Sequence, residues 1–150
     1  MRESPSFFAF PLMLSLHAIG MGLAAGINGA LALRLLGVAP VVPVSEMKRF
    51  FPVMWAGVWV NGLSGLALLI AYPTKALTNP VFYVKLALVA LALAISMSIG
   101  RRVFQPSAAP EAGGAWTQRR LAVASLAVWT SAITAGRLLA YTYTHILAAR

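Results

Sequence analysis

The sequence contains no cysteine, and this absence excludes several kinds of site at once. Without thiols the chain forms no disulfide, no thiolate zinc site, no iron–sulfur cluster and no covalently attached c-type haem. A metal bound by this chain must therefore use histidine, methionine or oxygen ligands. The 150 residues include only two histidines and three acidic residues, so the choice of ligands is narrow.

Charged residues are also scarce. Only 10% of the residues are charged and 60% are hydrophobic, which is far more apolar than a soluble domain. The formal net charge of +9 comes from lysines and arginines that flank apolar runs instead of gathering on one exposed face. This distribution argues against a nucleic-acid partner and indicates a membrane protein whose basic residues set its topology in the lipid bilayer.

Four apolar segments are each long enough to cross a hydrocarbon layer, which needs about 20 helical residues. The first segment is too long for the core of a cleaved signal peptide, and we expect it to span the membrane. The connections between the segments predict a single all-α domain over residues 1–150, an antiparallel four-helix transmembrane bundle. The predicted helices are residues 7–36, 51–72, 81–100 and 121–147.

Basic residues are unevenly divided between the two ends of this predicted bundle. By the positive-inside rule, the richer end is cytoplasmic. Both termini then lie on the periplasmic side of a bacterial inner membrane. The basic residues of the predicted cytoplasmic end are Arg34, Lys48, Arg49, Arg101, Arg102, Arg119 and Arg120.

Each predicted helix carries polar or small residues at helical spacing, which indicates a face that meets other helices. In the first helix this face contains His17. On the side of the helix opposite His17, Gly22 and Gly26 make a GxxxG spacing, which permits close approach of another backbone. The faces comprise His17, Gly20, Met21, Ala24 and Asn28 in the first helix, Gly57, Asn61, Ser64 and Gly65 in the second, Lys85, Ala92 and Ser96 in the third, and Thr130, Ile133, Thr134, Arg137, Tyr141 and Thr144 in the fourth.

Lys85 and Arg137 are cations inside predicted helices, whereas the only acids, Glu3, Glu46 and Glu111, lie outside them. A charged side chain that is unpaired in hydrocarbon costs at least about 2.5 to 3.5 kcal/mol. These two cations therefore either snorkel to lipid phosphates or meet an external anion. The candidate anions are a haem propionate and a carboxylate of a partner subunit, and contact with a quinone is a further alternative.

His17 has two interpretations. Imidazole is the usual axial ligand when haem b lies between the helices of a bundle. Alternatively, a neutral histidine bonds a hydroxyl or carbonyl group of a neighbouring helix. His145 is the candidate second axial ligand, and Met13 and Met21 are candidate soft metal ligands one turn either side of His17. Counting from the outer helix ends puts His17 about 15 Å deep, Lys85 about 8 Å and His145 about 5 Å, which disfavours the histidine pair.

The chain resembles an uncharacterised family of small four-helix bacterial inner-membrane proteins in three stretches, SLHAIGMGLAAGINGALALRLLG, NGLSGLALLIAYPTKALTNPVFYVKL and SLAVWTSAITAGRLLAY. This resemblance covers most of the chain and leaves out the connection 103–118. The segment NPVFYVK is also distantly similar to one in the copper-resistance D membrane proteins. The resemblance implies the same topology but no activity. Its matching positions are His17, Asn79, Pro80, Lys85, Trp129, Gly136 and Arg137.

Catalytic motifs do not occur in the sequence. It contains no pair of carboxylates, no nucleophile with a neighbouring base, no phosphate-binding glycine loop and no HExxH motif. We therefore expect an electron-transfer or accessory subunit instead of a self-contained enzyme.

Our leading hypothesis is a subunit that holds haem b through His17 and transfers electrons. It would connect a periplasmic redox partner with the quinone pool, or act within a larger respiratory or photosynthetic complex. The residues expected around the cofactor are Lys85, Arg137 and Tyr141. One alternative is a cofactor-free accessory subunit whose glycine faces pack against other membrane helices. The other is a small transporter of copper or another solute that uses His17, Met13 and Met21.

Overall fold

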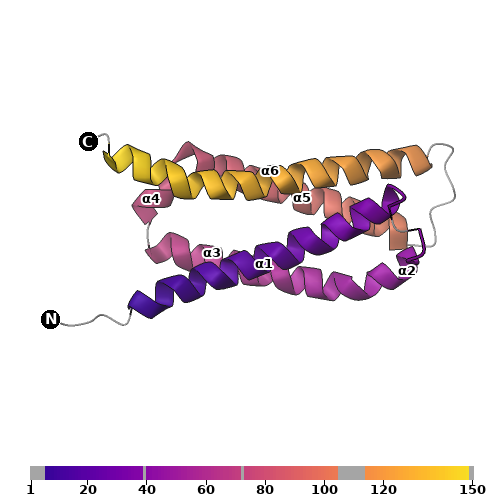
Figure 1. Ribbon diagram of the computed structural model, residues 1–150, viewed down its shortest axis with the longest axis horizontal. Helices are drawn as coiled ribbons and strands as arrows, with labels where there is room; N and C mark the ends of the chain where they lie inside the picture. The colour runs from indigo at the N-terminus through magenta and orange to yellow at the C-terminus, as the bar shows by residue number, and fades with distance from the viewer. Residues whose placement is uncertain (1–5, 39, 72, 105–113, 149–150) are drawn as a thin grey trace.

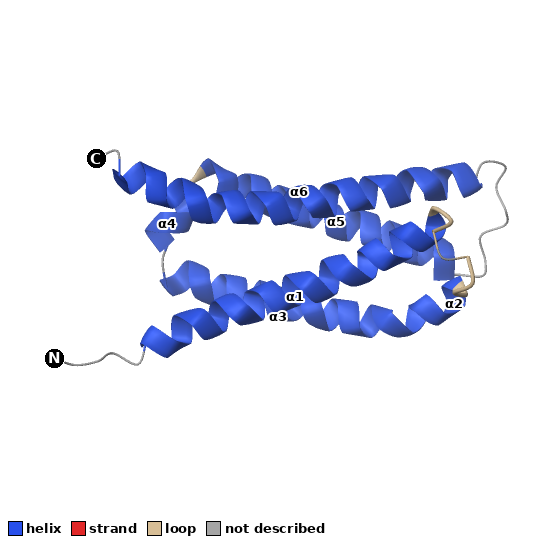
Figure 2. Ribbon diagram, viewed as in Figure 1, coloured by secondary structure: helices blue, strands red, loops and turns tan. Residues whose placement is uncertain are grey.

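The computed structural model describes residues 6–38, 40–71, 73–104 and 114–148, except the side chains of 6–9, 75 and 140–148. Every regular element in these residues is helical (Figure 2). Four long helices run in alternating directions and form a bundle, with the short helices at its ends (Figure 1). The elements are α1 Ser6–Leu35, α2 Val44–Met47, η1 Lys48–Phe50, α3 Phe51–Ala71, α4 Pro73–Leu77, α5 Pro80–Phe104 and α6 Gly114–Ala148.

The prediction of an all-α protein with four helices that can span a membrane is confirmed, because α1, α3, α5 and α6 are each long and apolar enough. Two helix ends differ from the prediction: the end of α5 and the start of α6. α5 continues to Phe104 and α6 begins at Gly114, so both are longer than expected. The prediction ended the third helix at Gly100, just before Arg101, and began the fourth at Leu121, just after Arg120. Arginine is a good helix former, however, and a charged turn can stay helical outside the hydrocarbon.

Local signals in the sequence determine two helix ends. The chain leaves α1 through Gly37, whose φ of 90° lies in the left-handed region that glycine adopts without strain. The N–H of Val38 there donates to the carbonyl of Leu33 at 3.0 Å, a bond typical of helix ends closed by glycine. At the start of α5, the side-chain oxygen of Asn79 accepts a hydrogen bond from the N–H of Val81 at 3.0 Å.

α1 and α3 form the most extensive helix interface, and two glycines bring their backbones together. A Cβ on Gly20 would lie 2.6 Å from the backbone nitrogen of Asn61. A Cβ on Gly57 would lie 2.7 Å from the Cβ of Leu23. Both distances are too short for real contacts, so only glycine permits this approach.

The GxxxG pair of α1 is not part of this interface. A Cβ on Gly22 or Gly26 would meet nothing within 4 Å in the described structure. Both glycines are exposed on the side of α1 away from His17. The close contact that their spacing permits is therefore not made within the described part of the chain.

The core lies where α1, α5 and α6 meet. Ala24, Ala92 and Trp129 are buried there and pack together, one from each helix. One helical turn nearer to the α2 end of the bundle, each of these helices contributes a second buried residue that is polar. These three residues are Asn28, Ser96 and Ser125.

The basic residues named above lie at one end of the bundle, where α1 and α5 end and α3 and α6 begin (Figure 1). Glu46 forms an exposed ion pair with Arg49 at this end, at 3.1 Å. α1 begins and α6 ends at the opposite end (Figure 1). The charge of the described chain is therefore concentrated at the α2 end.

Candidate functional site

His17 of α1 is the centre of the polar site and is half-buried. Its Nδ1 lies 3.0 Å from the backbone oxygen of Asn61 and 3.3 Å from Oγ of Ser64, both on α3. Because a carbonyl oxygen only accepts hydrogen bonds, Nδ1 carries the ring proton and donates it. Nε2 then has a free lone pair and is the acceptor nitrogen of the ring.

α3 holds this imidazole from one side. Nδ2 of Asn61 donates to the backbone oxygen of His17 at 2.8 Å, so α1 and α3 are bonded in both directions. Oγ of Ser64 donates to the carbonyl of Val60 at 2.6 Å and can therefore accept from Nδ1. Gly65 leaves room for the ring, because a Cβ there would lie 3.0 Å from Cε1 of His17. The predicted faces of these two helices thus meet.

Lys85 of α5 contacts the other ring nitrogen. Its Nζ lies 3.1 Å from Nε2 of His17, so the amine donates to the free lone pair. Gly136 of α6 faces this amine, because a Cβ there would lie 3.6 Å from Nζ. All four long helices therefore reach the site, at one level of the bundle.

The contact between Lys85 and His17 corrects their predicted depths. Counting from the helix ends placed Lys85 about 7 Å nearer to the outer surface than His17, yet the two side chains are hydrogen-bonded. The count assumed that the helices end at one depth. α1 instead extends further beyond the site than α5, which begins only at Pro80.

The His17–Lys85 pair combines a neutral imidazole with a hydrogen-bond donor. Imidazolium and ammonium 3.1 Å apart would repel each other, so only one of the two groups is charged at a time. With His17 neutral, two of the three N–H donors of the Lys85 ammonium have no partner among the described residues. The only acid in the described ranges, Glu46, lies at the α2 end. These two N–H groups can therefore donate hydrogen bonds to an oxygen atom of an external ligand.

The remaining predicted ligands are partly described. Met21 is half-buried and packs against the core cluster of Ala24, Ala92 and Trp129. The side chains of Tyr141 and His145 lie outside the described residues. Along α6, His145 follows Gly136 at a helix rise of about 13 Å, so its backbone lies well beyond the level of Lys85.

Arg137 does not share the surroundings of Lys85, although it is adjacent to Gly136. Its side chain is exposed, as are those of Thr130 and Thr134 on the same face of α6. The opposite face of this helix carries the buried Trp129 and Ala132. The predicted polar face of α6 therefore exists, but it is directed away from the core.

Two buried polar groups gave no functional signal in the sequence. Oγ of Ser125 and Nε1 of Trp129, one turn apart on α6, have no hydrogen-bond partner among the described residues. The hydroxyls of Ser96 and Ser131 each donate to the carbonyl four residues earlier, as is usual in apolar helices. An unsatisfied buried donor costs about 1 to 3 kcal/mol. In the sequence, Ser125 is distinguished only by a tryptophan one helical turn later.

On one side of the His17 ring, the hydrogen bond resembles that of a metal-binding histidine. Metal-binding histidines usually donate their second N–H to a carbonyl or carboxylate, and Nδ1 of His17 is bonded in this way to Asn61. On the other side, the lone pair of Nε2 is occupied by Lys85. An iron atom at Nε2 thus requires that Lys85 withdraw, and lysine has a long, flexible side chain.

Within the described residues, no group of three His, Cys, Asp or Glu side chains is placed to hold a metal ion. No protein-family model, curated protein or solved structure matches the chain. The resemblance to the four-helix bacterial family therefore stays a prediction. The functional conclusion rests on the surroundings of His17 and on the distribution of charge.

Proposed function

We propose that this chain is a four-helix subunit of the bacterial inner membrane that holds haem b through His17 and transfers electrons. Four helices long and apolar enough to cross a membrane support a bilayer location. The basic residues at the α2 end support an orientation with this end in the cytoplasm. The His17 site and both termini then lie toward the periplasm, so a periplasmic redox protein is the expected partner. Electrons pass to the quinone pool or within a larger respiratory or photosynthetic complex.

The contact of Nδ1 of His17 with the backbone oxygen of Asn61 is the observation that carries this proposal. The hydrogen bond from Nδ1 to the Asn61 carbonyl leaves Nε2 unprotonated and directed into the bundle. A histidine that would hold haem iron through Nε2 usually donates its Nδ1–H in this way. A histidine with Nε2 protonated would first have to exchange tautomers.

Lys85 has a second part in this proposal. When bound, haem b supplies one-electron chemistry. His17 would hold the haem iron through Nε2, and the ammonium of Lys85 would then be free to donate a charge-assisted hydrogen bond to a propionate. His17 and the packed faces of α1 and α3 orient the ligand nitrogen.

The proposal is tested by a reduced-minus-oxidised absorption spectrum of the purified protein, expressed with a haem precursor. We expect a b-type α-band in the wild type and none in His17→Ala, with unchanged helix content by circular dichroism. His145→Ala is the matched control, because it removes the other histidine and leaves the described site intact. A flat wild-type spectrum, or an equal band in His17→Ala, would contradict the haem proposal.

A cofactor-free accessory subunit is the second candidate, and one observation favours it. Both ring nitrogens of His17 already have partners within the chain, so the histidine needs no cofactor to be satisfied. This function predicts a colourless protein that remains bound to a larger membrane assembly. His17→Ala would then leave the assembly intact when the complex is isolated in mild detergent.

A further inference from the structure

Arg137 is an exposed cation at membrane depth. Its neighbour Gly136 faces the amine of Lys85, and Lys85 lies five residues into α5, about 8 Å below the start of that helix. The Arg137 side chain is exposed and makes no hydrogen bond or ion pair with any other described residue. A guanidinium has five N–H donors and stays protonated, so it requires an acceptor here.

Among the described residues, no acid is placed to meet Arg137. Glu46, the only acid in the described ranges, lies at the α2 end and pairs with Arg49. The four candidate spans contain no acid near the depth of Arg137. A symmetric dimer through this face would bring one Arg137 toward the other, which like charges oppose. The described part of the chain therefore supplies no anion for Arg137, and a different molecule is the source that we consider.

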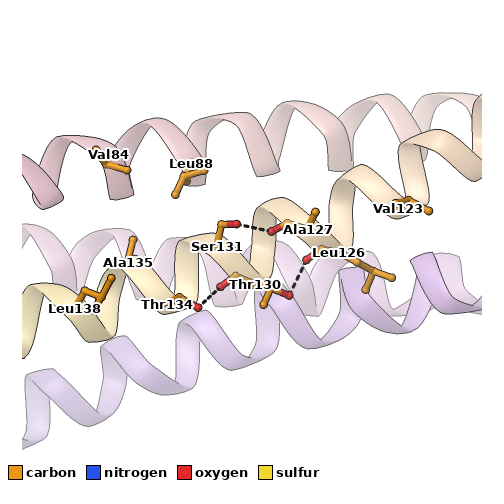
Figure 3. A pocket seen from close by; sticks show the side chains of 10 residues that line it. All are labelled: Val84, Leu88, Val123, Leu126, Ala127, Thr130, Ser131, Thr134, Ala135 and Leu138. Atoms are coloured by element: carbon orange, nitrogen blue, oxygen red, sulfur yellow. Dashed lines mark hydrogen bonds between the residues drawn. The ribbon is translucent and has the colours of Figure 1, made fainter.

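The rest of this face combines satisfied hydroxyl groups with an open apolar groove. Thr130 and Thr134 satisfy their hydroxyls within α6, by donating to the carbonyls four residues earlier at 2.7 and 2.9 Å (Figure 3). They therefore demand no polar partner. An open, mostly apolar groove of about 730 Å³ lies beside them between α5 and α6, lined by side chains such as Val84 and Leu88 (Figure 3).

We propose that the exposed face of α6 formed by Thr130, Thr134 and Arg137 binds a transmembrane helix of a different protein. A carboxylate of that helix pairs with Arg137, and its apolar side chains fill the groove. The guanidinium of Arg137 donates two parallel hydrogen bonds to the carboxylate of an Asp or Glu at this depth. The inference deepens the proposed role as a subunit of a larger complex, and it does not depend on haem.

Resonance energy transfer in phosphatidylcholine vesicles tests this proposal. The probe is a leucine-rich transmembrane peptide with one glutamate at the depth of Arg137, and its twin carries glutamine instead. The donor dye is attached to the single thiol that Ala115→Cys introduces into the cysteine-free chain. We expect the glutamate peptide to associate about tenfold more tightly than the glutamine peptide.

Arg137→Leu must abolish this preference, whereas Arg102→Leu, which removes an exposed arginine at the other end of the bundle, must keep it. Equal association of the two peptides, or a preference that survives Arg137→Leu, would overturn the proposal. So would loss of the preference when phosphatidylglycerol is added, because Arg137 would then bind lipid phosphate. A flat haem spectrum leaves this result unaffected, so the two proposals fail independently.

Discussion

Lys85 and Arg137 are two cations at nearly the same level of the bundle, and their surroundings are opposite. Lys85 is half-buried and donates to the imidazole of His17 at 3.1 Å. Arg137, next to the glycine that faces this amine, is exposed and has no acid within reach in the described chain. The difference teaches that two cations at one level of a bundle can have opposite surroundings: one contacts a neutral base of a neighbouring helix, and the other is exposed.

Disrupting the contact between α1 and α3 is expected to lower the stability of the bundle most. In Gly57→Val, the new Cβ would lie 2.7 Å from the Cβ of Leu23, so the helices must separate. We expect a loss of about 1 to 3 kcal/mol in unfolding free energy, as for other overpacked interfaces. Titration with sodium dodecyl sulfate, followed by circular dichroism, measures this loss.

Gly62→Val is the control for this variant, because a Cβ at Gly62 meets nothing within 4 Å. Both variants place a β-branched residue in the interior of α3, so their intrinsic helix propensities change equally. Equal stabilities of the two proteins would show that the Gly20–Gly57 contact does not hold the inner face together.

Thiol labelling compares the accessibility of the two cation positions directly. The chain lacks cysteine, so Lys85→Cys and Arg137→Cys each provide a single thiol. We expect the exposed position to react about tenfold faster with N-ethylmaleimide in detergent, because access controls the rate when thiols are otherwise alike. Mass spectrometry over time gives both rates. Equal rates would mean that Lys85 is as accessible as Arg137.

The smallest effect is expected from single hydrogen bonds. Asn61→Leu removes the bond from Nδ2 to the His17 carbonyl and should cost about 0.6 to 2 kcal/mol, the range of interhelical bonds in membranes. Thr130→Val on the outer face removes only a bond within α6 and should change stability by less than about 0.5 kcal/mol. The same detergent titration measures both, and a larger loss for Thr130→Val would reverse the assignment of inner and outer faces.

The sequence predicted the features that depend on local pattern. Four spans follow from the length of the apolar runs, and the polar faces of α1, α3 and α5 follow from helical spacing. The same spacing grouped Thr130, Thr134 and Arg137 on one face of α6, as the structure has them. A helical wheel, however, says which residues share a face and not which face points inward.

Relations between helices could not be predicted in this way. The bond between His17 and Lys85 depends on how far α1 is shifted along α5, and no local signal sets that shift. For the same reason the GxxxG spacing pointed to Gly22, whereas Gly20 and Gly57 make the close contact. Such contacts depend on all four helices together.

The site also joins two halves of the chain. α1 and α3 form one helical hairpin and α5 and α6 the other, with α4 between them. His17 belongs to the first hairpin and Lys85 to the second, so their bond exists only after the hairpins have met in the bilayer. Before that, the second hairpin holds an ammonium group with no base beside it, at a cost that favours assembly. The pair is therefore present only in a bundle whose two hairpins are packed against each other.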